Sequence, residues 1–170
     1  MTELEQERKL SPLPPVVIGG ALIIPVGLLR RLGGARPIKL PEIVQDTERS
    51  EALAMEAVME AERRLGYKPR DVSALNLGYD VESLVPETAR LRFIEVKGRV
   101  DGADTVTVTR NEILTGLNKP EDFILSLGLV NGEKVTLRYV RQPFSREPDF
   151  GATSVNYKLT ELLARSTEPN

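Results

Sequence analysis

Three residues in the middle of the chain have the types and spacing of a metal-dependent hydrolytic site. Asp80 is the last residue of the motif GYD, and Glu95 and Lys97 lie in the motif IEVKG farther along the chain. On a strand, Glu95 and Lys97 point to the same face because they are two positions apart. Two carboxylates that lie close together repel, and a divalent cation between them removes that cost. Such a cation polarises a phosphoryl oxygen and activates water, while a lysine stabilises developing charge.

The composition restricts the chemistry of this site. The 170 residues include no cysteine and no histidine, which excludes a disulfide framework, a thiol nucleophile and a histidine base. Metal ligands must therefore be oxygens, which favours Mg²⁺ or Mn²⁺. Hydrophobic residues make up 41% and charged residues 28%, as in ordinary globular domains. The expected compartment is the cytoplasm.

Helix and strand patterns predict an α/β domain with a central sheet. A helix is expected over residues 47–65, capped by Asp46 or Thr47 and ended by Gly66. A second helix over 111–117 is expected after Thr109, and a short third one over 158–166. The expected strands cover 71–75, 78–84, 91–99, 104–110, 122–130 and 134–140, with a turn at Asn131-Gly132 between the last two. A hairpin between 78–84 and 91–99 would place Asp80 beside Glu95.

The first helix supplies two candidate acids. At 100° per residue, Glu51 and Glu62 fall on one stripe with Met55, Val58 and Leu65. A carboxylate on an apolar stripe needs a partner. We therefore expect Glu51 or Glu62, rather than the acids of the opposite face, to complete the shell around the metal.

The chain divides into three expected parts. Residues 1–46 form an N-terminal connecting segment whose apolar stretch, 15–29, is too short to span a membrane and resembles a buried strand. Residues 47–145 form the domain, in which Gly98 and Gly102 are expected in turns. Residues 146–170 form a C-terminal tail, loop-like at first and then helical. No membrane association is expected.

Several polar side chains are candidates for contacts with nucleic acid. Arg99, Arg110, Asn111 and Lys119 could line one cleft, with Arg110 and Asn111 touching phosphate at the start of a helix. The alternative for that helix start is a simple cap made by Thr109 or Asn111. The formal charge of −2 gives no general attraction for DNA, so we expect weak binding at physiological salt.

Three sequence segments, in this order along the chain, resemble those of a known family. The runs AMEAVMEAERRLGYKPRDVSALNLGYDVES, LRFIEVKGR and VTVTRNEI closely resemble the Mrr-like domain named after the C-terminal part of protein NO VEIN. The resemblance covers roughly residues 47–145. That family is placed in the PD-(D/E)xK nuclease superfamily and often stands at the C-terminus of helicases near restriction and phage-defence genes. Ile113 stands where the family often has tryptophan.

The resemblance implies a fold and a set of roles. The fold would be a restriction-endonuclease-like core, with a central mixed β-sheet flanked by helices. Asp80 and Glu95 would hold the metal, Lys97 would be the catalytic lysine, and Glu51 would be the helix acid, with Glu62 as second choice.

Three functions remain open at this point. One is a Mg²⁺-dependent DNA endonuclease working with a helicase or ATPase motor, in the same or a separate chain, in defence, restriction or repair. Another is a nucleic-acid-binding module without turnover. The last is a protein-interaction module that docks through residues 12–32. The sequence leaves the oligomeric state unknown, and no GxxxxGK motif for an ATP-binding motor occurs in it.

Overall fold

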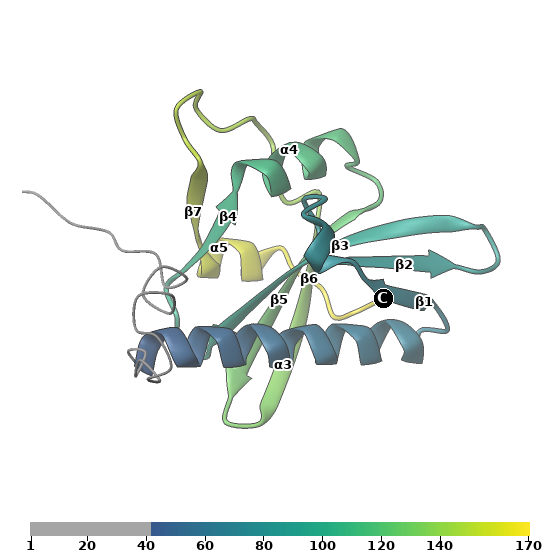
Figure 1. The fold of residues 1–170 in the computed structure, drawn as a ribbon, viewed down its shortest axis with the longest axis horizontal. Coiled ribbons are helices and arrows are strands. Elements are labelled where there is room, and N and C mark those ends of the chain that lie inside the picture. Colours follow the sequence, from purple (N-terminus) through teal and green to yellow (C-terminus); the bar gives the residue numbers. More distant parts are fainter. Residues whose placement is uncertain (1–41) are drawn as a thin grey trace, which may run out of the picture. The chain divides into compact units, whose positions relative to one another are not determined.

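A five-stranded mixed sheet lies at the centre of the structure, a computed structural model that describes residues 42–170 and their side chains from Thr47 (Figure 1). The strands are β1 (Lys68–Asp71), β2 (Val81–Val85), β3 (Arg90–Val100), β5 (Phe123–Asn131) and β6 (Lys134–Arg141), in the order β1-β2-β3-β5-β6. β3 and β5 run parallel, and the other neighbours are antiparallel. The predicted α/β class with a central mixed sheet is confirmed. The expected connecting segment and its apolar stretch lie outside the described residues, apart from 42–46.

The long helix α3 (Glu42–Arg64) packs across one face of this sheet. Its residues are mostly good helix formers, and Val58 and Ala54 are fully buried against Ile94 and Ile124. Gly66 ends the helix with a φ of +84°, and the amide of Tyr67 donates to the carbonyl of Glu62 at 3.0 Å. The helix was correctly predicted, but its expected start was wrong. It begins at Glu42, so Asp46 and Thr47 lie inside it, because no glycine or proline interrupts residues 42–46.

Two glycines allow α3 to approach the sheet closely. Gly98 of β3 and Gly128 of β5 are paired in the parallel ladder. A Cβ on Gly98 would lie 2.1 Å from the carbonyl oxygen of Ser50, and a Cβ on Gly128 would lie 2.5 Å from the Cβ of Ala54. Gly98 is therefore a packing residue within a strand, and its expected place in a turn was wrong.

The opposite face of the sheet is covered by a smaller layer. β4 (Thr105–Thr109) pairs antiparallel with β7 (Ser154–Lys158) in a two-stranded sheet. The helices α4 (Arg110–Asn118) and α5 (Leu159–Ala164) follow these strands. Their buried side chains join those of β5 in one core cluster: Val106, Val108, Ile113, Phe123, Leu125, Leu159 and Leu162.

Three local predictions were wrong. Residues 71–75 are not a strand, because β1 ends at Asp71 and a 3₁₀ turn, η1, covers Ser73–Leu75. The turn between β5 and β6 is Gly132-Glu133, since Asn131 pairs with Lys134. The stretch expected to be loop-like contains β7, whereas the short helix expected after it is confirmed as α5, which packs into the core. Among the described helices, none is long and apolar enough to cross a membrane.

Candidate functional site

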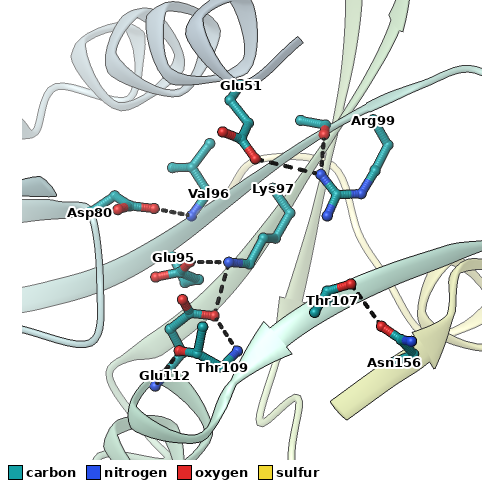
Figure 2. A network of polar contacts seen from close by, with 11 residues as sticks. Glu51, Asp80, Glu95, Val96, Lys97, Arg99, Thr107, Thr109, Glu112 and Asn156 are labelled. Atoms are coloured by element: carbon teal, nitrogen blue, oxygen red, sulfur yellow. Dashed lines mark hydrogen bonds and ion pairs between the residues drawn. The ribbon is translucent and has the colours of Figure 1, made fainter. Parts of the chain in front are cut away.

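The expected acid pair and lysine line one cleft (Figure 2). Its walls come from the middle of β3, the residue before β2, the middle of α3 and the first turn of α4. Asp80 precedes β2, and its amide donates to the carbonyl of Ile94 at 3.0 Å. That hydrogen bond extends the β2–β3 hairpin and brings Asp80 into the same cleft as Glu95 and Lys97. The cleft has a volume of about 390 Å³, and its ionisable lining residues are Glu51, Asp71, Asp80, Glu95, Lys97 and Glu112.

Glu95 and Lys97 form a buried ion pair. The Lys97 Nζ lies 2.6 Å from Glu95 Oε1, and the two side chains are only 12% and 4% exposed, respectively. Asp80 Oδ2 accepts a hydrogen bond from the backbone N–H of Val96 at 2.9 Å. The residue between the acid and the lysine of the E-x-K run therefore fixes the Asp80 carboxylate with its main chain.

Burial changes the ionisation of this group of residues. Loss of solvation, reinforced by the nearby Asp80 and Glu112 carboxylates, raises the pKa of Glu95 to about 8, although Lys97 opposes the shift. Burial also raises the pKa of Asp80, against the Val96 N–H and Lys97. Burial disfavours the charged form of Lys97, but Glu95 and Glu112 outweigh it and raise the pKa of the ammonium. The cleft thus holds more carboxyl groups than its one lysine can pair with.

Glu112 is part of this site, and the sequence reasoning missed it. Its Oε2 lies 2.9 Å from Lys97 Nζ and accepts the Thr109 amide at 2.9 Å. The amide of Glu112 in turn donates to Thr109 Oγ1, which completes a capping box at the start of α4. The expected cap by Thr109 is confirmed. The Thr-x-x-Glu pattern of a capping box could have identified Glu112 from the sequence. The Glu112 carboxylate both caps the helix and contacts the buried Lys97.

The two candidate helix acids lie in different environments. Glu51 lines the cleft, but its side chain is 52% exposed and lies 3.7 Å from Arg99, so the expectation that it is buried was wrong. Glu62 is buried, as expected, but away from the cleft. It accepts a hydrogen bond from the Tyr139 hydroxyl at 2.9 Å and lies 3.4 Å from the buried Arg92. The structure therefore brings Glu51, and not Glu62, to the acid pair.

The four expected nucleic-acid contacts do not line one cleft. Arg99 lies at the cleft through Glu51 and its own hydrogen bond to the Gly98 carbonyl. Arg110 donates to the carbonyls of Asp149 and Phe150 and so supports the loop before β7. The Asn111 amide donates to the Asn76 carbonyl, while Lys119 lies over the Phe93 ring at 4.1 Å. None of the four is among the lining residues of the cleft, and only Arg99 contacts one of them, Glu51.

The donor set of the cleft suits a hard divalent cation. Asp80 and Glu95 offer oxygen ligands, and Mg²⁺ commonly binds through one or two carboxylates and keeps several waters. Burial raises the pKa of both carboxyls, so neutralisation of their charge, by a proton or by a cation, is favoured. Within residues 47–170, no three acidic side chains gather closely enough to form a complete metal cage. The residues therefore fit a two-carboxylate site completed by water.

Comparison with known proteins gives one family. A family model described as "Protein NO VEIN, C-terminal" matches residues 50–140, more than half of the 170-residue chain. The match includes Asp80, Glu95, Lys97 and Glu112 and ends before β7 and α5. A comparison with curated proteins gave no match.

Proposed function

The chain belongs to the family of the C-terminal domain of protein NO VEIN, and we propose that it is a metal-dependent nuclease domain of the PD-(D/E)xK type that hydrolyses DNA. One observation carries this proposal. A buried lysine is held by Glu95 of β3 in the same cleft as a second carboxylate, Asp80, which directly precedes the neighbouring strand β2. A buried acid–lysine pair beside several carboxyl groups costs free energy, and groups of this kind cluster at functional sites.

The fold supports the proposal. The E-x-K run lies in β3 near the centre of a mixed sheet, and the second acid opens the hairpin partner of that strand. Residues on packed strands are held more precisely than residues on loops, as a hydrolytic site requires. The motifs GYD and IEVKG resemble those of the Mrr-like domains. This resemblance implies the same arrangement of two acids and a lysine at adjacent strands.

The roles follow from the positions of the side chains. Asp80 and Glu95 would hold Mg²⁺ or Mn²⁺. When bound, that cation supplies a polarised phosphoryl oxygen and a water of lowered pKa. The Lys97 ammonium, kept charged by its two carboxylate neighbours, hydrogen-bonds the attacking water or stabilises the charge that develops on the phosphate. The Val96 amide keeps the Asp80 carboxylate in place.

We also propose that a helicase or ATPase motor, in the same or a separate chain, delivers DNA to this domain. The resemblance to domains that stand beside helicases supports this association with defence, restriction or repair. A formal charge of −2 is consistent with a domain that binds DNA weakly without such a motor.

A second candidate function is a nucleic-acid-binding module that has lost turnover. It is favoured by the ligand geometry, because no three acids among residues 47–170 form a metal cage. In this reading, Lys97 and its carboxylates are a structural ion-pair cluster.

Cleavage of DNA by matched variants tests the proposal. We expect the wild-type chain with Mn²⁺ to cut plasmid DNA, and Asp80→Asn, Glu95→Gln and Lys97→Gln to lose at least about 100-fold of that activity. Lys134→Gln removes an exposed lysine on β6 and should cut like the wild type. A folded wild-type chain that cuts neither plasmid nor single-stranded DNA with Mg²⁺ or Mn²⁺ would favour the binding module.

A further inference from the structure

The outer edge of β6 is only partly used within the described part of the chain. β6 ends the strand order of the five-stranded sheet, so one of its edges has no neighbouring strand there. At that edge, the Tyr139 amide donates to the Thr167 carbonyl and the Thr167 amide donates to the Tyr139 carbonyl, both at 2.8 Å. The edge therefore accepts an extended chain with the two hydrogen bonds of an antiparallel pair.

The remainder of this edge is open. Backbone groups alternate between the two edges of a strand, so the amides and carbonyls of Val135 and Leu137 point the same way as those of Tyr139. No backbone hydrogen bond between described residues uses them. A row of unpaired N–H and C=O groups is a template for pairing with another extended chain.

A groove of about 700 Å³ lies beside the open edge, between β6 and α3. Its apolar lining includes Leu53, Ala57 and Ala61 of α3, and Val135 and Leu137 of β6. A strand added to β6 would turn every second side chain into this groove, because side chains alternate between the two faces of a sheet. The groove therefore offers a place for those side chains along the flank of the helix.

Acidic side chains outnumber basic ones in this groove. Its ionisable lining residues are Glu56, Glu60, Glu133, Glu168, Arg64 and Arg138. Glu60 and Glu133 have arginine partners, and the guanidinium of Arg138 donates to a serine. Glu56 and Glu168 form no ion pair with any described residue. The groove thus presents two exposed, unpaired carboxylates to whatever lies in it.

Lysine and arginine side chains match both properties of the groove. Their aliphatic stems cover apolar surface while the cation stays at a polar site. The stems would lie on Leu53 and Ala57, and the cations would reach Glu56 and Glu168. Acidic side chains would meet the same two carboxylates, and a contact between like charges costs free energy.

We propose that the open edge of β6 binds an extended basic segment of a partner protein as an added strand. Main-chain hydrogen bonds to Val135 and Leu137 supply affinity, and a lysine or arginine at every second position supplies specificity through the acidic groove. The edge from Lys134 to Arg138 has room for about five residues of the segment. The inference does not depend on the proposed nuclease activity, because the groove and the cleft share no lining residue.

Binding of fluorescent peptides to the full chain at physiological salt tests the inference. The probe is a capped peptide of alternating lysine and valine, about eight residues long. Its charge control has glutamate in place of lysine. Two further peptides carry N-methyl groups on all lysines or on all valines. Each removes the backbone donors from one edge of the added strand and leaves the charge unchanged.

The protein variants change the charge of the groove. Glu56→Lys combined with Glu168→Lys reverses the two unpaired carboxylates. Glu87→Lys combined with Glu147→Lys is the matched control, since both acids are exposed and lie outside the groove. Thermal melting verifies that each variant folds.

We expect the lysine–valine peptide to bind the wild type, and the glutamate–valine peptide to bind at least about tenfold more weakly. One of the two N-methylated peptides should lose at least about tenfold in affinity, and the other should bind like the unmodified probe. The groove variant should lose at least about tenfold, and the control variant should stay within about twofold of the wild type. No binding of the probe, equal binding of both methylated peptides, or equal loss in the two variants would overturn the inference.

Two other occupants of the edge would give different results. A second copy of the chain would make it a dimer in light scattering, and Val135→Pro, which removes an N–H that points away from β5, would restore the monomer. Another segment of the same chain would protect the amides of Val135 and Leu137 from hydrogen exchange in the free monomer. Either result would overturn the assignment of the edge to a partner protein.

Discussion

Glu95 is the residue at which function and stability oppose each other. In the unfolded chain its carboxyl ionises near the ordinary value of 4.5, whereas burial raises the pKa in the folded chain to about 8. Between these values the folded state holds a proton that the unfolded state releases. The contribution of Glu95 to the free energy of unfolding therefore falls as the pH rises from about 4.5 to 8.

The first prediction is that Glu95→Gln is more stable than the wild type at pH 8.5 without divalent metal. The amide carries no charge to desolvate, so the gain should be at least about 1 kcal/mol. The difference should disappear at pH 4, where Glu95 is protonated in both states. Urea unfolding at the two pH values measures it, and a variant that is less stable than the wild type at pH 8.5 would contradict the raised pKa.

Glu112 has two roles that substitutions can separate. Glu112→Gln can still accept the Thr109 amide, so we expect the unfolding free energy to change by less than about 0.5 kcal/mol. It removes the negative charge beside Lys97, and turnover at saturating DNA should fall at least about tenfold.

Thr109→Ala is the matched control for Glu112. It removes the capping hydroxyl at a cost of about 1 kcal/mol and leaves the acceptor of Lys97 in place. Turnover at saturating DNA should stay near that of the wild type. If both variants lose turnover equally, Glu112 acts only through the helix cap.

At the residue scale, the sequence predicted the site residues that neighbouring strands bring together. It did not predict the contacts that depend on packing between distant elements. Strand alternation places Glu95 and Lys97 on one face, and a hairpin brings Asp80 to them. Glu112 comes from a helix beyond another strand, so its contact with Lys97 depends on packing that no local pattern contains. Glu51 was expected on a buried stripe, but α3 leaves its side chain at the open side of the cleft.

At the scale of elements, the contact between α3 and β3 positions the cleft. A Cβ on Gly98 would lie 2.1 Å from a backbone oxygen of the helix, which cannot move as a flexible side chain can. The third prediction is that Gly98→Ala destabilises the chain by about 2–3 kcal/mol, because α3 must shift away from the sheet.

Gly151→Ala is the control for that substitution. A Cβ there meets nothing within 4 Å and the backbone is not in the left-handed region, so stability should change by less than about 0.5 kcal/mol. Thermal denaturation of both variants measures the difference. Equal stability of the two alanine variants would show that the close approach of α3 to β3 is not required.

Elements with strong local signals were predicted, and the failures have a common cause. The alanine-rich helix and the apolar strand β5 are evident from composition and periodicity. β7 was assigned to a loop although SVNYK alternates polar residues with Val155 and Tyr157, because the run is only five residues long and follows a loop-like stretch. It becomes a strand because β4, far back in the sequence, offers it a partner. Long-range pairing of this kind leaves little trace in a short window.

At the scale of the whole molecule, the C-terminal segment belongs to the domain. Leu159 and Leu162 are 3% and 1% exposed in the same core cluster as Phe123 and Leu125. The family match ends at residue 140, so these contacts lie beyond it.

The fourth prediction is that a chain ending at residue 145 loses cooperative unfolding. Truncation exposes the core side of β4 and removes two buried leucines, each worth about 1.5–3 kcal/mol. A chain ending at residue 168 keeps both leucines and the Tyr139–Thr167 bridge, and should melt close to the wild type. Circular dichroism during heating measures both. A shorter chain that melts like the full one would show that residues 47–145 form a self-sufficient domain.

The sequence predicted the mixed α/β class. It did not predict that α3 covers one face of the central sheet while β4, β7, α4 and α5 cover the other. The strand order depends on the parallel pairing of β3 and β5. The connection between these two strands contains β4 and α4, so the pairing is not between sequence neighbours.

The central claim is that Asp80 and Glu95 together hold a divalent cation, and calorimetric titration of Mn²⁺ tests it most directly. The wild type should bind one ion, and the Asp80→Asn and Glu95→Gln variants should each lose that binding. Glu133→Gln, which removes an exposed acid from the β5–β6 turn, should bind like the wild type. A folded wild-type chain that releases no heat with Mn²⁺, or binding that survives both cleft substitutions, would contradict the claim.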